Sequence, residues 1–394
     1  MSIKNRLLLA LLCSSLLIAG CNDNDKRRVI TSDKAAIINT VDPGFAGANL
    51  ELVDLLNTDT PLTAVEGNYD TNQSDFGLTA HGEYFYRIGK YNIDTVTKYS
   101  IRNPEHEIYT YSTIDKSDDT TSNTYTMVFL NDEKAYLIRY ASDEIWVVDP
   151  SAATEAEFKT GEIDLSDYRR NNTPPGMSDG VIVDGKLYVS LQRLDGWTPT
   201  AGESYVAVID TATDTEIDTR ESDSSATLKG IQLESANPQS IIYNPEAGLF
   251  VQSIGTWSDD YIGGVEKIDT SDYSTELLID DDNTTGRISG LAIVNDTLGY
   301  IISYTGWQNT SLYSFDPADG SIASSAVSNL AGPELDITSL TVDEDGRLWV
   351  SIGDASNPRV EILDTMSDSI VHTLETVMNP GKVVFAEASK TIQD

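Results

Sequence analysis

The sequence predicts an all-β fold, a β-propeller of seven four-stranded blades that is closed by strands from both ends of the chain. Two observations lead to this prediction. A short apolar strand that ends in aspartate recurs along the chain, and an aromatic strand precedes most copies of it. A recurrence of about 50 residues in strand-rich sequence is typical of propeller blades, which bury their faces only against neighbouring blades. The chain of 394 residues, 40% of them hydrophobic, is long enough for such a ring.

The strand that ends in aspartate marks the period of the repeat. Its five regular copies end at Asp149, Asp210, Asp269, Asp316 and Asp364, and successive copies lie 47 to 61 residues apart. We letter the strands of a blade a to d from the axis outward and assign this strand to position c. A sixth copy, residues 50–54, stands alone near the N-terminus.

Strand b carries the recurring aromatic residue, in alternation with small or apolar residues as half-buried strands require. Its copies are centred on Phe85, Tyr136, Tyr188, Phe250, Tyr300 and Trp349. Polar pairs such as Asp184-Gly185 precede most copies and suit the tight hairpin between strands a and b. This layout gives six blades at residues 75–116, 124–165, 177–220, 237–280, 287–330 and 336–377.

Two leftover fragments make the seventh blade. Residues 381–387 have the pattern of an inner strand a, with or without the start of a strand b, and residues 50–54 and 61–65 have the pattern of an outer c–d pair. Sharing one blade between both ends of the chain removes open sheet edges. Six or eight blades remain alternatives, because the first blade lacks the strand that ends in aspartate.

Residues 1–20 are predicted to be a signal peptide. Lys4 and Arg6 form its basic start and residues 7–18 its apolar stretch, which is too short to span a bilayer permanently. The following Leu-Ile-Ala-Gly-Cys sequence resembles a bacterial lipobox. That resemblance implies cleavage before Cys21 and lipidation of its thiol.

The same resemblance implies a location. In Gram-negative lipoproteins a residue other than aspartate after the cysteine, here Asn22, implies sorting to the outer membrane, with the leaflet left open. We expect residues 21–46 to be the lipidated cysteine and a flexible tether, and residues 47–394 to be the propeller domain.

Residues 205–217, Tyr-Val-Ala-Val-Ile-Asp-Thr and the turn after them, resemble the YVTN-type repeat of surface-layer-like propellers. The resemblance is clearest over residues 177–217 and weaker elsewhere. Such repeats occur in proteins with different functions, so the resemblance implies a fold and not an activity.

Three tryptophans recur at one position, just after strand b, in blades 3, 4 and 5. They are Trp197, Trp257 and Trp307, and Tyr304 stands close to the last of them. Because the b–c loops of a propeller emerge on one face, we expect these side chains to form an aromatic wall beside the channel mouth. Alternatively, each indole packs on its own blade, since an exposed indole is unfavourable unless it contacts something.

Five arginines are candidates for holding an anionic ligand on the same face. Arg87, Arg139 and Arg193 fall late in strand b or just after it, and Arg169 and Arg170 lie in the loop between blades 2 and 3. Guanidinium groups suit a carboxylate, phosphate or catecholate. The alternative is that each pairs with one of the 63 acidic residues, which is common and energetically minor at a surface.

Catalytic groups are not recognisable. The three histidines, His81, His106 and His372, are assigned away from the b–c loops, so a histidine-based triad or metal centre lacks its parts. Asp280, Asp281 and Asp282 offer oxygen ligands for Ca²⁺ without EF-hand spacing, and a solvated acidic loop is the alternative. We assign no catalytic residue. With a net charge of −37 and no basic stripe, a nucleic-acid partner is not expected.

The sequence therefore favours a binding protein over an enzyme. We expect an outer-membrane lipoprotein whose propeller binds a small-molecule ligand or a protein. The resemblance to tethered propellers implies capture of an iron chelate, haem or a similar cofactor for a TonB-dependent transporter as an expected role. An interaction scaffold for another envelope protein and a carboxylate- or Ca²⁺-dependent hydrolase or lyase are the alternatives.

Overall fold

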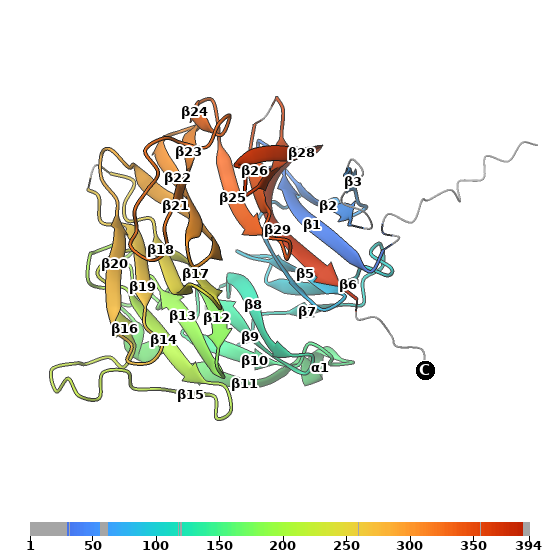
Figure 1. Ribbon diagram of the computed structural model, residues 1–394. Helices are drawn as coiled ribbons and strands as arrows, with labels where there is room; N and C mark the ends of the chain where they lie inside the picture. The colour runs from blue at the N-terminus through green and yellow to red at the C-terminus, as the bar shows by residue number, and fades with distance from the viewer. Residues whose placement is uncertain are drawn as a thin grey trace, which may run out of the picture.

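The computed structural model describes residues 30, 32–55, 62–116, 118, 120–258, 260–354 and 356–388. The described chain folds into seven antiparallel sheets arranged around a central axis, so the predicted seven-bladed propeller is confirmed (Figure 1). Among the residues that the structure describes, helical structure is limited to one turn, α1 (Glu155–Phe158), and one 3₁₀ turn, η1 (Ser166–Tyr168). In the described residues no helix is long and apolar enough to cross a membrane.

The first three blades follow the order of the chain. Blade 1 contains β4 (Phe76–His81), β5 (Tyr84–Gly89), β6 (Thr95–Ser100) and β7 (Tyr109–Ser112). Blade 2 contains β8 (Thr124–Asn131), β9 (Lys134–Arg139), β10 (Glu144–Val148) and β11 (Lys159–Asp164). Blade 3 contains β12 (Met177–Val183), β13 (Lys186–Leu191), β14 (Tyr205–Asp210) and β15 (Thr215–Glu216), and a fifth strand, β16 (Ile231–Gln232), also pairs with β14.

The next three blades repeat the same order. Blade 4 contains β17 (Pro238–Asn244), β18 (Gly248–Ser253), β19 (Gly264–Ile268) and β20 (Thr275–Asp280). Blade 5 contains β21 (Arg287–Asn295), β22 (Leu298–Gly306), β23 (Asn309–Phe315) and β24 (Ala331–Pro333), the last just beyond the predicted range. Blade 6 contains β25 (Ile337–Val342), β26 (Leu348–Ile352), β27 (Arg359–Asp364) and β28 (Ser369–Glu375).

Blade 7 joins the two ends of the chain, with the sheet order β29 (Asn379–Glu387), β1 (Lys34–Val41), β2 (Ala48–Asp54) and β3 (Ala64–Glu66). Figure 1 shows the first strand in blue beside the last in red. Strand b of this blade is β1, which lies in the stretch that we expected to be a flexible tether, so that expectation is wrong for residues 34–41. The six central residues of β1 are buried, because a strand b is covered by blades on both sides. The predicted signal peptide and Cys21 lie outside the described residues.

The recurring aspartate closes the turn between strands c and d. In each regular copy its Oδ1 accepts a hydrogen bond from the backbone N–H two residues later, at 2.8 to 3.0 Å; the donors are Ser151, Ala212, Ser271, Ala318 and Met366. Aspartate recurs there because its short carboxylate can mimic a backbone acceptor and so start a tight turn.

The strand-b aromatic residues fill the spaces between blades. Tyr136 and Tyr300 are fully buried, and their hydroxyl groups donate hydrogen bonds to Asp214 at 2.7 Å and Asp368 at 2.6 Å, each in the c–d turn of the next blade. A buried tyrosine needs such a partner for its hydroxyl group. The same side chain therefore supplies core volume and links neighbouring blades.

Glu51 of β2 ties the closing blade to the loop that leads into β29. Its side chain is 1% exposed, and Oε1 accepts a hydrogen bond from the backbone N–H of Val377 at 2.8 Å. Burial raises the pKa of Glu51 from 4.5 to about 7. Because the folded state holds this proton more tightly than the unfolded chain does, its stabilising contribution is present at low pH and is lost as the pH rises through about 7.

Replacing Glu51→Gln should therefore stabilise the protein at alkaline pH. Glutamine keeps an oxygen acceptor for Val377 but carries no charge to desolvate. After allowance for solvent screening, we expect the free energy of unfolding at about pH 8 to rise by about 1–2 kcal/mol, and its fall between about pH 5 and 7 to become smaller. Urea unfolding at about pH 5 and about pH 8 measures these free energies of unfolding. The exposed Glu276→Gln on β20 is the control, and an equal effect there would contradict the prediction.

Candidate functional site: one face and the channel behind it

The b–c and d–a loops emerge at one end of the central channel, which we call the bc face. This face carries every large aromatic side chain that is exposed in the described part of the chain. They are Phe45 (71% exposed), Tyr91 (58%), Trp197 (88%), Trp257 (66%) and Trp307 (78%). Each comes from the b–c loop of a different blade, namely blades 7, 1, 3, 4 and 5. The five side chains therefore share a face although they are far apart in the sequence.

Two of these aromatic residues were not predicted. Phe45 lies between β1 and β2, in the stretch expected to be a tether, and its backbone has a φ of +58°. Tyr91 follows strand β5 of blade 1 directly, which is the position that the tryptophans occupy in later blades. Extending the search from tryptophan to any aromatic residue after strand b would have found Tyr91.

Phe45 and Trp307 line a hollow of about 470 Å³ in this face. Blades 5, 6, 7 and 1 contribute to it, and Phe76 and Pro380 add apolar wall. Asp75 and Asp336 line the same hollow, so its wall mixes aromatic and acidic groups.

The predicted alternative, packing of the indoles on their own blades, holds only in part. Trp257 makes an edge-to-face contact with Tyr304 of blade 5, with ring centroids 5.3 Å apart, and yet stays largely exposed. Trp197 stands at the tip of a tight turn closed by a hydrogen bond from the N–H of Asp195 to the oxygen of Thr198 at 3.0 Å. That these aromatic residues bind a ligand remains a prediction.

Three of the five predicted arginines lie together beside Trp197. The side chain of Arg193 donates to the backbone oxygen of Tyr168 and to Glu203, each at 3.0 Å. Arg170 donates to the backbone oxygen of Arg193 at 3.4 Å, and Arg169 pairs with Asp143. Only Arg169 keeps a substantially exposed side chain, at 41%. This group therefore offers less free positive charge than expected.

Arg139 and Arg87 do not reach the surface. Arg139 is 0% exposed; it pairs with Asp118 and lies over the ring of Trp146, 4.1 Å from its centroid. Arg87 is 7% exposed and donates to the backbone oxygen of Tyr69 at 2.7 Å, and burial lowers its pKa to about 10. Their proposed contact with a ligand on the loops is therefore not supported, because side chains of strand b point into the spaces between blades.

The acidic run at the end of blade 4 is used within the fold. Asp281 is buried, and its Oδ1 accepts a hydrogen bond from the N–H of Gly263 at 2.8 Å; burial raises its pKa to about 6. Asp282 accepts hydrogen bonds from the N–H groups of Thr284 and Thr285, at 2.7 and 2.6 Å, and Asp280 is exposed. In the described ranges no group of three His, Cys, Asp or Glu side chains could hold a metal ion, so a Ca²⁺ site here has no support.

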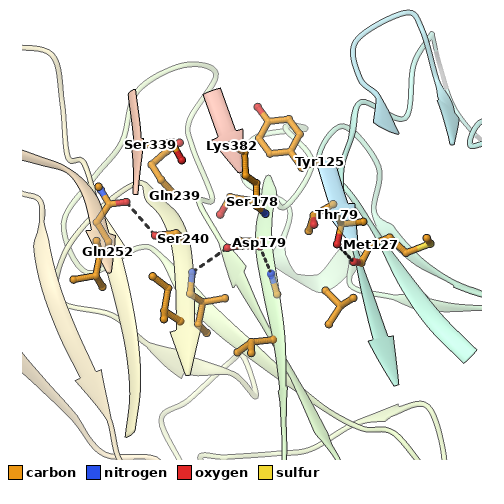
Figure 2. Close-up of a pocket in the computed structure, with 18 of the residues that line it drawn as sticks. Thr79, Tyr125, Met127, Ser178, Asp179, Gln239, Ser240, Gln252, Ser339 and Lys382 are labelled. Atoms are coloured by element: carbon orange, nitrogen blue, oxygen red, sulfur yellow. Dashed lines mark hydrogen bonds between the residues drawn. The ribbon is translucent and has the colours of Figure 1, made fainter. Parts of the chain in front are cut away.

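The channel behind the bc face has a volume of about 830 Å³ and is lined by the inner strands of all seven blades. Six of these strands carry a β-bulge near their start, with one extra residue on the inner strand. The extra residues are Tyr125, Ser178, Gln239, Ser289 and Thr338, and in β29 Gly381 and Lys382 together oppose Asn39. A bulge re-aims the side chain it carries. Each bulge contributes a residue to the channel wall, and Figure 2 shows four of the side chains there.

The histidines lie as predicted, away from the bc face. His81 lines the channel at the end of β4, at the a–b turn, where its Nε2 is 2.9 Å from Oδ1 of Asp132. His106 lies in the c–d loop of blade 1, and His372 lies in β28. The fold does not bring the three together.

No protein-family model matches the chain, and no curated protein matches it in sequence. Solved structures match it in fold. A candidate 6-phosphogluconolactonase from Bacteroides uniformis has a TM-score of 0.60 at 15% identity, covering 90% of this chain and 99% of that chain. Apo AztD from Citrobacter koseri has a TM-score of 0.52 at 12% identity, and the match covers 90% of this chain and 98% of that chain. Dihydro-heme d1 dehydrogenase NirN in complex with DHE has a TM-score of 0.53 at 12% identity, and the match covers 88% of this chain and 67% of that chain. Identities this low establish the propeller fold and not a shared activity.

The burial of Arg139 leads to a stability prediction. Arg139→Ala leaves the buried Asp118 carboxylate without its partner, and breaking a buried pair in this way typically removes about 3–5 kcal/mol. The matched control Arg169→Ala breaks an exposed pair and should remove at most about 1 kcal/mol. Urea unfolding of both variants measures the difference. Equal losses would mean that Arg139 is not the structural group that its burial indicates.

Proposed function

We propose that this protein is a lipid-anchored binding protein of the outer membrane that captures a ligand on its bc face. One observation carries the proposal: the exposed aromatic side chains all lie on that face. Of the large apolar side chains exposed in the described residues, only Ile108 and Met366 belong to loops at the opposite end of the channel. An aromatic side chain left in water is unfavourable, and one-sided exposure of this kind marks an interaction surface.

The ligand class that suits this face is planar, partly aromatic and anionic, such as haem or a ferric catecholate. Flat ligands can stack between Trp and Phe rings, and Phe45 and Trp307 line the same hollow. Arg169 lies outside that hollow and pairs with Asp143, but its side chain is 41% exposed and keeps donor capacity for an anionic substituent. A propeller of similar fold is part of NirN, whose structure holds DHE, so the fold is compatible with a bound macrocycle. Delivery to a TonB-dependent transporter is the role we infer for such capture.

A protein partner is the second candidate. The observation that favours it is the spread of the aromatic residues over five blades, because a flat protein surface can contact all of them at once. Aromatic residues are also the side chains most enriched at the energetic centres of protein interfaces.

The ligand proposal is tested by tryptophan fluorescence with haem and ferric catecholates. We expect saturable quenching in the wild type and at least about a tenfold loss of affinity after Trp197, Trp257 and Trp307 are all changed to alanine, because stacking on three indoles is removed. Binding by that variant is measured by calorimetry, since only the buried Trp146 and Trp349 remain to report by fluorescence.

The control removes apolar groups from the opposite face, through Ile108→Ala with Met366→Ala, and should leave binding unchanged. Unchanged binding by the triple tryptophan variant would overturn the proposal. Capture of a transmembrane envelope protein, lost in that variant and combined with indifference to all small molecules, would favour the second candidate.

The lipid anchor is tested separately. Cys21→Ser should abolish incorporation of labelled palmitate and move the protein from the membrane fraction to the soluble fraction, because the acyl chains supply the membrane affinity. Cys13→Ser is the matched control, since that residue lies in the predicted signal peptide, and it should change neither result. Labelling that persists in Cys21→Ser would contradict the anchor.

A further inference from the structure

The channel contains a lysine and an aspartate, Lys382 and Asp179, that form no ion pair within the described residues. Of the titratable groups in its wall, Lys90 pairs with Asp75 at 3.0 Å and His81 lies 2.9 Å from Asp132. Lys382 and Asp179 form no such pair, although the Lys382 charge acts on Asp179 through space. A cation without a carboxylate partner is notable in a chain that carries 63 acidic and 26 basic residues.

Lys382 is placed in the channel by the bulge of β29, where Gly381 and Lys382 oppose the single residue Asn39. Its side chain is exposed and lines the channel. The bulge therefore places an ammonium group without an ion-pair partner in the described residues near the start of β29, as the other five bulges place their residues near the starts of their inner strands.

Asp179 stands at the same level, directly after the bulged residue Ser178 of β12. Its Oδ1 accepts a hydrogen bond from the N–H of Gly180 at 2.9 Å, and its Oδ2 accepts one from the N–H of Ile241, in the next blade, at 3.2 Å. These bonds hold the carboxylate rigidly, and each oxygen keeps acceptor capacity for a ligand. Desolvation raises the pKa of this carboxyl group, so a positively charged partner would favour its ionised form.

The two charges lie in opposite parts of the ring, since β12 belongs to blade 3 and β29 to blade 7. Figure 2 shows both side chains among those that line one pocket. The hydroxyl-bearing residues Ser240, Ser289, Ser339 and Thr338 and the amide of Gln239 complete the polar wall. The channel volume of about 830 Å³ is within the range of small-molecule sites.

We propose that the channel is a binding site for a small zwitterion of the α-amino-acid type, with Lys382 holding its carboxylate and Asp179 its ammonium group. A simple anion would be attracted by Lys382 and repelled by an ionised Asp179. A simple cation would be attracted by Asp179 and repelled by Lys382. A zwitterion satisfies both unpaired charges at once, which is why opposed charges select it. This site is distinct from the aromatic residues of the bc face and does not depend on the function proposed for them.

The experiment is a thermal-shift screen followed by calorimetry on the mature protein, with the proteinogenic L-amino acids as probes. At least one free amino acid should raise the melting temperature, because it binds the folded state. Its N-acetyl derivative, which lacks the ammonium group, and its amide, which lacks the carboxylate, should each bind at least about tenfold more weakly.

Variants assign the two charges. Lys382→Met and Asp179→Asn should each weaken binding by at least about tenfold, whereas the exposed Lys229→Met and Asp296→Asn should leave it unchanged. Lys382 is exposed and forms no ion pair within the described residues, so its variant tests the site even if Asp179→Asn is unstable. The triple tryptophan variant should bind the amino acid normally, which separates this site from the bc face.

Three outcomes would overturn the proposal. They are the absence of binding by any free amino acid, equal binding of acetate or phosphate with no loss in Asp179→Asn, and unchanged amino-acid affinity in Lys382→Met. The second outcome would identify the channel as a site for simple anions.

Discussion

The pairing of β29 with β1 is the constraint on which the rest of the structure depends. It joins the two ends of the chain in one sheet, in which β1 is paired on both sides, with β29 and with β2. Closure holds the seven inner strands around one channel. It also decides the role of the segment after β1, which becomes the b–c loop of blade 7 and places Phe45 on the same face as the tryptophans.

The layering of each blade decides which side chains a ligand can reach. Both faces of strand b are covered by the neighbouring blades, so its side chains build the core. Even arginines in this strand, Arg87 and Arg139, are buried. Side chains in the b–c loops and at the bulges of the inner strands escape this constraint. The exposed aromatic residues lie in the b–c loops, and Lys382 lies at a bulge of an inner strand. The groups that we propose for binding are therefore concentrated where the strand ladders are interrupted.

Much of the fold could be predicted because its signals are local. The Asx turn after strand c needs only an aspartate and the next two residues, and the aromatic alternation of strand b extends over a few positions. The prediction failed at β1, where a short apolar run, Ala35 to Ile38, has its partner strand at the opposite end of the chain. The candidate site was predicted in part, since Trp197, Trp257 and Trp307 share a face as expected. The arginines were misjudged because position along a strand does not reveal the direction of burial.

The sequence by itself determined the blade period, the c–d turns, the shared position of three tryptophans and the assignment of the histidines away from them. Each of these follows from a repeat, and equivalent positions in a repeat occupy equivalent places in a ring. Only the tertiary structure decided that Phe45 joins the tryptophans, that Arg139 is a buried ion-pair member, and that Asp179 and Lys382 share a channel. These depend on ring closure, on burial between blades and on bulges that depart from the repeat, and none of them is encoded in the spacing of residues along the chain.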